Sequence, residues 1–223
     1  LSSSSGQTFQ SVWRTLTKEA QDSFVGFFVD RPCEGLSLAT QFLPQEKIFN
    51  FAPPTDLEKA KQKLFFEEKF LDWMAKQNPK PLIFLIGFFK ILSPQFLECG
   101  AAVINTHPSL LPLFPGMDKK VHALAFEQSL VSGFSIHMVN EELDGGALIF
   151  QKAVDTSAAQ NADELRDLVR EKEQKYLPLV MERLLLTDLQ GSDRKLTTRQ
   201  LQEKLKIQKG IYLRRSILSG ACL

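Results

Sequence analysis

Three side chains of this sequence carry complementary chemistry: Asn105, His107 and Asp144. An asparagine amide can donate a hydrogen bond to a developing oxyanion. A histidine can carry a proton or, when it is charged, donate to the same oxyanion. A carboxylate beside the histidine favours the charged ring and fixes its orientation. Together these residues suit the transfer of an acyl group without a covalent enzyme intermediate.

Each of the three residues also has an ordinary structural explanation. Asn105 can cap a turn, and His107 can be a hydrogen-bonded histidine of the core. Asp144 lies in a Leu-Asp-Gly-Gly sequence that is typical of turns. The other two histidines, His122 and His137, are interpreted as helix-surface and strand residues.

The sequence contains no motif for a nucleophile or a metal. Ser109 is close to His107 but lies in no nucleophile elbow, so a covalent mechanism is not favoured. The three cysteines are an odd number without the spacing of zinc ligands, which indicates reduced thiols in a cytoplasmic protein that needs no metal. Gly6, in SSSSGQTFQ, can place backbone N–H groups at a helix start, a weak phosphate-binding pattern that is neither a P-loop nor GxGxxG.

Short β-rich runs alternate with longer helical patterns along the chain. Strands are predicted at residues 24–30, 47–51, 81–89, 101–107, 133–140 and 147–155, and helices at 35–42, 57–77, 121–130 and 162–186. The alternation predicts an α/β, Rossmann-like fold in which helices flank a mostly parallel twisted sheet. A short turn joins the last two strands, so an antiparallel strand pair is expected at one side of the sheet.

The strand over residues 101–107 places Asn105 and His107 where ligands of open α/β sheets bind, at the carboxyl end of a strand. A loop with Pro108, Pro112 and Pro115 follows directly. Proline restricts the backbone, so this loop can shape a pocket while losing little entropy on binding.

Length and charge limit the classes of function. The 223 residues, 43% of them hydrophobic, suffice for one sizeable core. A net charge of +1 and the lack of an 18-residue apolar run give no reason to expect nucleic acid or a membrane as partner. We expect one enzymatic domain over residues 1–189, with its first strand truncated before Gly6. A basic tail over residues 190–223 is not expected to be a separate domain, and monomer and homodimer both remain open.

Two long segments resemble the folate-dependent formyltransferases. INTHPSLLPLFPGMD, residues 104–118, is similar to the active-site loop of that family, and GFSIHMVNEELDGGALIFQKAV, residues 133–154, to a second family segment. SGQTFQ, EGLSLA, IGFFKILSPQFL and REKEQKYLPLV add to a likeness that covers residues 1–186. It is greatest to the branch that formylates glycinamide ribonucleotide in de novo purine biosynthesis. The resemblance implies direct attack of that amine on 10-formyltetrahydrofolate, through a tetrahedral intermediate.

The resemblance also implies roles for particular residues. Asn105 and protonated His107 would hold the oxyanion, and Asp144 would favour the charged ring and relay a proton through water. His137 matches a family histidine near the site. The ribonucleotide would be bound by Gly6, Gln7, Thr8, Arg170 and Glu173. The folate would be bound by Lys63, Phe89, Lys90, Ile91, Leu92, Asn105, Asn140, Glu141, Glu142, Leu143 and Asp144.

The sequence departs from the family pattern at two of these places. Lys90 stands where many members have arginine, and the turn Ser4–Thr8 lacks the first glycine of Gly-x-Gly-Ser-Asn. Three other functions therefore stay open. Formyltetrahydrofolate deformylase uses water as acceptor, and methionyl-tRNA formyltransferase carries a further C-terminal domain. A non-catalytic folate- or nucleotide-binding remnant would explain the changed turn, but it would not explain why Asn105, His107 and Asp144 are all present.

Overall fold

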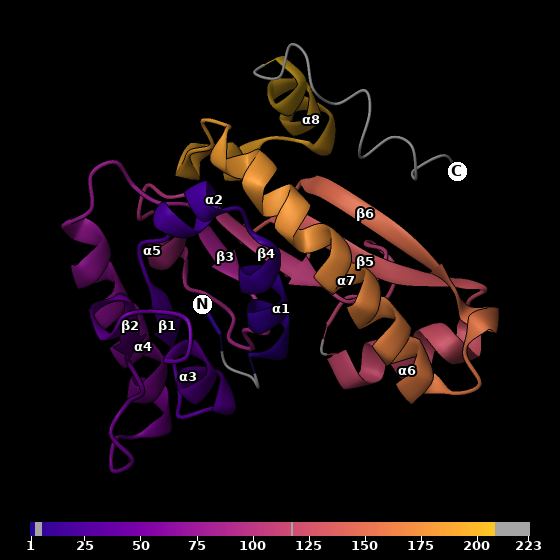
Figure 1. Ribbon diagram of the computed structural model, residues 1–223, viewed down its shortest axis with the longest axis horizontal. Coiled ribbons are helices and arrows are strands. Elements are labelled where there is room, and N and C mark those ends of the chain that lie inside the picture. The colour runs from indigo at the N-terminus through magenta and orange to yellow at the C-terminus, as the bar shows by residue number, and fades with distance from the viewer. Residues whose placement is uncertain (3–5, 117, 208–223) are drawn as a thin grey trace.

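A computed structural model of the chain describes residues 1–2, 6–116 and 118–207 (Figure 1). The strands are β1 (Phe27–Val29), β2 (Ile48–Asn50), β3 (Ile83–Leu85), β4 (Val103–His107), β5 (Val131–Met138) and β6 (Leu148–Asp155). The α-helices are α1 (Gln7–Thr15), α2 (Lys18–Asp22), α3 (Glu34–Ala39), α4 (Lys59–Ala75), α5 (Pro94–Leu97), α6 (Asp118–Gln128), α7 (Ala162–Leu185) and α8 (Thr198–Ile207). Short 3-10 helices cover Gln45–Lys47, Thr156–Ala158 and Gly191–Lys195.

The strands form a parallel pair, β1–β2, and a four-stranded sheet in the order β3-β4-β5-β6. Residues Leu1 and Ser2 lie between these two sheets, because the Ser2 N–H donates to the Phe28 carbonyl and the Ile86 N–H donates to the Leu1 carbonyl, both at 3.0 Å. β3 and β4 are parallel, whereas β5 runs antiparallel to both β4 and β6. The predicted α/β fold with an antiparallel pair at one side is therefore confirmed.

Several predicted strands are shorter than expected. Of residues 24–30 only Phe27–Val29 form a strand, and the largest difference is at residues 81–89. The apolar run 81–89 was expected to be a single strand, but β3 ends at Leu85. Gly87 then adopts a left-handed backbone with φ of 59°, which turns the chain out of the sheet. Residues 87–92 consequently form a loop at the carboxyl end of β3, and this loop becomes one wall of the site described below.

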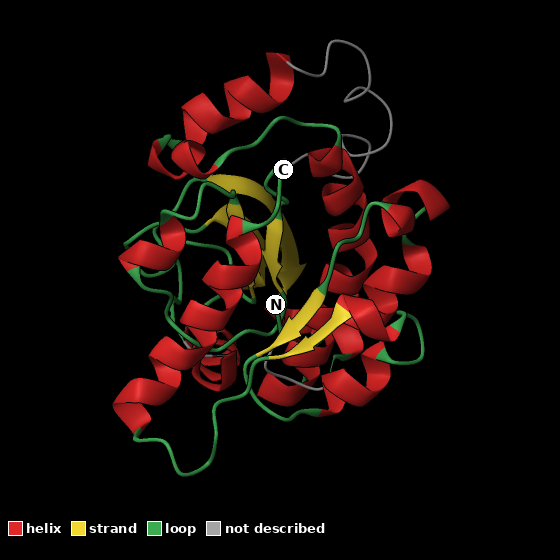
Figure 2. Ribbon diagram, turned by 90° about the vertical axis from the view of Figure 1, so that its left-hand side faces the viewer, coloured by secondary structure: helices red, strands yellow, loops and turns green. Residues whose placement is uncertain are grey.

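Alternate side chains of the central strands enter different cores, as the pleat of a strand requires. Ile83, Leu85 and Val103 pack in one cluster with α4 and α5. Ile86 and Ile104 belong to a second cluster with α1 and α7. Helices thus cover both faces of the sheet (Figure 2). Each fully buried Leu, Ile or Phe contributes about 1.5–3 kcal/mol, so these two clusters hold the strand ends in place.

The long helix α7 begins with a clear start signal. The Asn161 side chain accepts from the Glu164 N–H at 2.9 Å, and Asp163 and Glu164 place negative charge at the positive end of the helix dipole. Figure 1 shows α7 crossing the sheet diagonally beside α1. This course carries the middle of the helix past the carboxyl ends of the strands.

Part of the predicted basic tail packs on the sheet. The Leu148 N–H of β6 donates to Oγ1 of Thr198 at the start of α8, at 3.0 Å. Leu201 and Leu205 are buried in the same core cluster as α7. Residues 208–223 of the expected tail lie outside the described residues. Among the helices that the structure describes, none is long and apolar enough to cross a membrane.

Candidate active site

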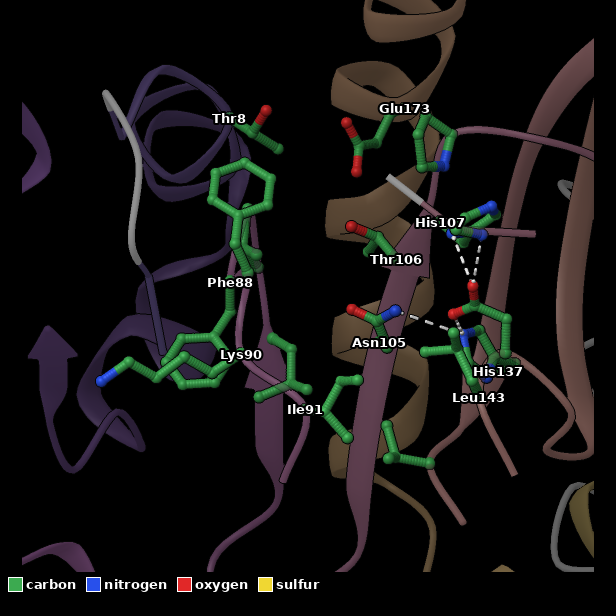
Figure 3. A pocket seen from close by; sticks show the side chains of 18 of the residues that line it. Thr8, Phe88, Lys90, Ile91, Asn105, Thr106, His107, His137, Leu143 and Glu173 are labelled. Carbon is green, nitrogen blue, oxygen red and sulfur yellow. Dashed lines mark hydrogen bonds and ion pairs between the residues drawn. The ribbon is translucent and has the colours of Figure 1, made fainter. Parts of the chain in front are cut away.

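A cavity of about 600 Å³ opens at the carboxyl ends of β3 and β4 (Figure 3). Its walls come from the start of α1, the loop after β3, the end of β4, the loop between β5 and β6, and the middle of α7. All residues singled out as site residues from the sequence line this cavity, with the exception of Lys63. The volume lies within the range of about 300–1,000 Å³ that is usual for small-molecule sites.

Asn105 is held by a histidine on the neighbouring strand. Asn105 and His137 are direct partners in the antiparallel β4–β5 register, and Nδ2 of the amide lies 3.2 Å from Nε2 of the ring. His137 uses Nδ1 at 2.9 Å from the carbonyl of Met138, which can only accept, so Nδ1 carries the proton. Nε2 of a neutral ring must then accept from the amide. The second N–H of the Asn105 amide remains available to a ligand.

The electrostatics of His137 agree with this tautomer. Burial lowers the pKa of His137 from its ordinary value, because a charged ring loses its hydration there. The Met138 carbonyl and Asp144 act in the opposite direction, and His107 adds to the lowering. The net lowering favours a neutral His137 that accepts from Asn105.

His107 has a partner on each ring nitrogen. Its Nε2 lies 3.0 Å from the carbonyl of Phe114 and therefore donates to it. Its Nδ1 lies 3.6 Å from Oδ2 of Asp144, which is a charge contact and too long for a hydrogen bond. A lone pair on Nδ1 would face the carboxylate unfavourably, whereas a second proton there would form an ion pair. Nδ1 is thus the ring nitrogen that faces the carboxylate, and Nε2 is the one that donates to the loop.

Asp144 is placed by backbone features of three segments. Its own φ is 54°, a left-handed value that side chains rarely adopt. Gly146, two residues later, passes so close to β5 that a Cβ would lie 1.7 Å from the Met138 carbonyl oxygen. The Gly116 N–H donates to Oδ2 of Asp144 at 2.9 Å. Oδ1 lies 3.9 Å from Nε2 of His137, so the carboxylate stands between the two histidines.

A buried serine network supports the loop that holds His107. Ser109 donates to the carbonyls of Leu113 and Phe114 at 2.6 and 3.1 Å. Ser135 donates to the Ser109 carbonyl at 2.6 Å and accepts from the Leu111 N–H at 2.9 Å. Both serine side chains are fully buried. The Phe114 carbonyl that receives His107 is therefore fixed from the core side of the loop.

The upper end of the cavity combines a helix start with polar side chains of α7. Gly6 has a φ of 76°, and a Cβ on it would lie 2.6 Å from the Cα of Gly35. Gln7 and Thr8 then open α1, whose first N–H groups have no partner within the helix. Glu173 lies opposite Thr8 in Figure 3, and Arg170 lines the same cavity. This end can hold an anionic group together with polar hydroxyl or amine groups.

The lower end of the cavity is bounded by two loops that expose apolar side chains. Phe89 and Ile91 from the first loop are 51% and 66% exposed, and Leu143 from the second is 59% exposed. Ile91 and Leu143 lie on either side of Asn105 in Figure 3. The other members of the second loop that line the cavity are Val139, Asn140, Glu141, Glu142 and Asp144. Two apolar walls with backbone groups between them can clamp a flat heterocycle such as a pterin.

The structure describes the side chain of only one of the two lysines that were predicted to bind the folate. Lys90 lines the cavity, but its ammonium lies 3.2 Å from Asp30 and points away from Asn105 and His107 (Figure 3). Lys63 belongs to α4, and its side chain lies outside the described residues.

Sequence reasoning missed several residues of the cavity wall. His122 was interpreted as a helix-surface residue, but it is buried and lines the cavity. Arg166 also lines it, one helical turn before Arg170 on α7, and this i, i+4 spacing was the signal that could have identified it. Thr106 and Phe88 contribute as well. Among the described residues no group of three or more His, Cys, Asp or Glu side chains could hold a metal ion.

Comparison with known proteins gives consistent matches. The family model described as formyl transferase matches residues 1–181. The chain is 30% identical to phosphoribosylglycinamide formyltransferase of Bacillus subtilis over 188 residues, which are 82% of this chain and 91% of the relative. Phosphoribosylglycinamide formyltransferase of Campylobacter jejuni superposes with a TM-score of 0.69 at 26% identity, covering 82% of this chain and 94% of that structure. Glycinamide ribonucleotide transformylase 1 of Geobacillus kaustophilus gives a TM-score of 0.68 at 26% identity, with coverage of 82% and 95%.

Proposed function

Because this chain belongs to the formyl transferase family, we propose that it transfers the formyl group of 10-formyltetrahydrofolate to the amine of glycinamide ribonucleotide, a step of de novo purine biosynthesis. The observation that carries the proposal is the division of one cavity into a polar end at the start of α1 and an apolar end, with Asn105, His107 and Asp144 between them. A hydrolase that uses water as acceptor has no need of the first end.

The residues fit the two substrates of this reaction. The start of α1 at Gly6, Gln7 and Thr8 would take the phosphate, and Arg170 and Glu173 would hold the ribose and amine. Backbone groups of residues 89–92 and 140–144 would bind the pterin, with Phe89, Ile91 and Leu143 packing on its faces. 10-Formyltetrahydrofolate acts as co-substrate in this scheme, and the site needs no metal.

In the proposed mechanism the amine nitrogen bonds directly to the formyl carbon. The formyl oxygen becomes an oxyanion, which accepts hydrogen bonds from the Asn105 amide and from charged His107. His107 now donates to Phe114, so the substrate oxygen must replace that carbonyl when the complex forms. Asp144 receives the proton that the amine loses and returns it through water to the folate nitrogen. The carbon–nitrogen bond to the folate then breaks and releases tetrahydrofolate.

The first experiment is to follow release of tetrahydrofolate from 10-formyltetrahydrofolate with and without glycinamide ribonucleotide, for the wild type and for Asp144→Asn. We expect release that depends on the ribonucleotide and falls at least about a hundredfold in the variant, the usual scale for one such electrostatic group. Release without the ribonucleotide would indicate a deformylase. Absence of release from folded protein would favour a non-catalytic binding protein.

We further propose that residues 1–189 are the formyltransferase domain and that residues 190–223 are an extension of it, supported by the packing of α8 on β6. A cytoplasmic location is supported by the free thiols of Cys33 and Cys99. The enzyme would act as a monomer or a homodimer on small molecules alone, and light scattering after size-exclusion chromatography distinguishes the two states.

A further inference from the structure

We propose that Asp30 is a positioning residue for folate binding, and that it acts by holding Lys90 so that the loop of residues 87–92 keeps its shape. This inference rests on the proposed function, because it assigns that loop to the folate. In this proposal the Lys90 ammonium does not contact the folate directly but pairs with Asp30 inside the protein. Neither Asp30 nor Arg31 is among the residues that line the cavity.

Asp30 is a buried charge whose cationic partners come from two directions. It follows β1 directly, and its side chain is fully buried. Oδ2 lies 3.2 Å from Nζ of Lys90 and 3.1 Å from Nη2 of Arg31. A buried carboxylate must be paired, because an isolated charge would be costly to remove from water. The pair therefore ties the cavity loop to the carboxyl end of β1.

Lys90 is only 20% exposed, whereas Arg31 is 47% exposed. Nζ of Lys90 also lies 5.6 Å from the ring centroid of Phe66 on α4, within the range of a cation–π contact. The stem of Lys90 thus crosses from the cavity wall into the protein. An ammonium held in this way is not directed at a ligand in the cavity.

The loop of residues 87–92 needs the contact between Lys90 and Asp30 because its other attachments to the protein lie at its two ends. It begins at Gly87, and it ends where the Ser93 N–H donates to the buried Glu67 carboxylate at 3.0 Å. Phe88 and Leu92 are buried, while Phe89 and Ile91 are exposed to the cavity on either side of Lys90. Lys90 is therefore placed to set the angle at which Phe89 and Ile91 face the folate.

The test compares Lys90→Met, Asp30→Asn and the double variant with Arg31→Met as the matched control. Arg31→Met removes a cation that pairs with Asp30 but does not belong to the cavity loop, so it leaves that loop attached. Calorimetry with the full chain would give the Kd for tetrahydrofolate and for tetrahydropteroate, which lacks the glutamate. Hydrogen exchange of residues 87–92 provides a readout that does not depend on turnover.

For Lys90→Met and Asp30→Asn we expect Kd to rise about tenfold for both ligands, which is about 1.4 kcal/mol. Exchange in residues 87–92 should become faster, and the double variant should be no worse than either single variant. At saturating substrates kcat should stay within about twofold, whereas KM for 10-formyltetrahydrofolate should follow Kd. Lys90→Arg should restore binding, and Arg31→Met should leave binding and loop exchange unchanged.

Each of several results would overturn the proposal. A loss confined to tetrahydrofolate, with Asp30→Asn unaffected, would make Lys90 a direct contact of the glutamate. If Arg31→Met weakened folate binding as much as Lys90→Met does, the Asp30–Lys90 ion pair would have only a general effect on stability. If Kd or the hydrogen exchange of residues 87–92 were unchanged in Lys90→Met, the ion pair would not hold the loop. A wild type that binds tetrahydrofolate without ribonucleotide-dependent turnover would refute the proposed function alone, since the comparison of Kd values would stand. A wild type that binds neither ligand would refute both.

Discussion

Nδ2 of Asn105 and Nε2 of His137 lie 3.2 Å apart on neighbouring antiparallel strands. Because Nδ1 of His137 already donates to the Met138 carbonyl, Nε2 can only accept while the ring is neutral. The contact therefore orients the Asn105 amide so that its second N–H is free for substrate. His137 acts on the proposed reaction through Asn105, and three of its predicted effects can be separated by experiment.

Replacing His137 with phenylalanine should lower kcat about tenfold and leave both KM values nearly unchanged. Loss of a complete oxyanion donor costs about 10²–10³ in rate, and loss of its orientation costs part of that. Steady-state kinetics with each substrate varied in turn would measure the effect.

The combination with Asn105→Ala provides the control for this substitution. If His137 works through Asn105, the double variant should be no slower than Asn105→Ala alone, because the supported group has been removed. Rate losses that multiply in the double variant would show that His137 has a separate role.

The stability of the wild type should fall when the pH drops below about 6.5, the ordinary pKa of histidine. Burial lowers the pKa of His137 in the folded state, so between the folded and unfolded pKa values the unfolded chain binds more protons. Stability then rises with pH over that window, by at most about 1.4 kcal/mol per pH unit for one proton. Urea unfolding between pH 5 and 8 would measure the slope. His137→Phe should have a smaller slope, and an unchanged slope would assign the effect to other groups.

Ser135→Ala should reduce the free energy of unfolding by about 1–3 kcal/mol and also slow the reaction. The substitution leaves the Leu111 N–H without its buried acceptor and removes one of the two acceptors of the Gln151 amide, which keeps the Leu111 carbonyl. It also removes the bond to the Ser109 carbonyl, which holds the loop that follows His107. Chemical denaturation and kcat would be measured together. Ser37→Ala, at an exposed hydroxyl that donates to the Glu34 carbonyl, should stay within about 0.5 kcal/mol of the wild type. Equal losses in the two variants would argue against the network.

The fold was predictable because its strands and helices have strong patterns. The apolar run before Asn105 predicted the parallel centre of the sheet. The short turn between the last two strands predicted its antiparallel side. Strand ends were less predictable. Residues 86–89 are as apolar as β3, and only the left-handed backbone at Gly87 separates the loop from the strand.

The candidate site was predictable in its residues but not in their contacts. A sequence carries the types Asn105, His107 and Asp144, but not the pairing of Asn105 with His137 or of His107 with the Phe114 carbonyl. Lys90 shows the limit most clearly. The family resemblance implied that Lys90 belongs to the site, and it lines the cavity, but the direction of its ammonium depends on Asp30, sixty residues earlier in the sequence.

Gly6→Ala should raise KM for glycinamide ribonucleotide at least about tenfold and destabilise the protein more than Gly100→Ala does. Both glycines have positive φ, 76° and 84°, so both substitutions carry a backbone cost of about 1–3 kcal/mol. They differ in the space around the added methyl group. At Gly6 it would lie 2.6 Å from the Cα of Gly35, whereas at Gly100 the nearest atom is the Lys80 Cγ at 3.8 Å.

The amount by which Gly6→Ala destabilises the protein more than Gly100→Ala therefore measures the effect of the close approach between Gly6 and Gly35, which positions the start of α1. Because the atoms nearest to the added methyl group are all backbone atoms of Gly35 in α3, relief of the clash must move the helix start away from α3. The N–H groups of Gln7 and Thr8 would then no longer converge on the phosphate, while the folate end of the cavity would be unaffected. Kinetics with each substrate varied in turn would show a change in KM for the ribonucleotide alone. Equal changes for both substrates, or equal effects of Gly6→Ala and Gly100→Ala, would remove the start of α1 from the proposed phosphate site.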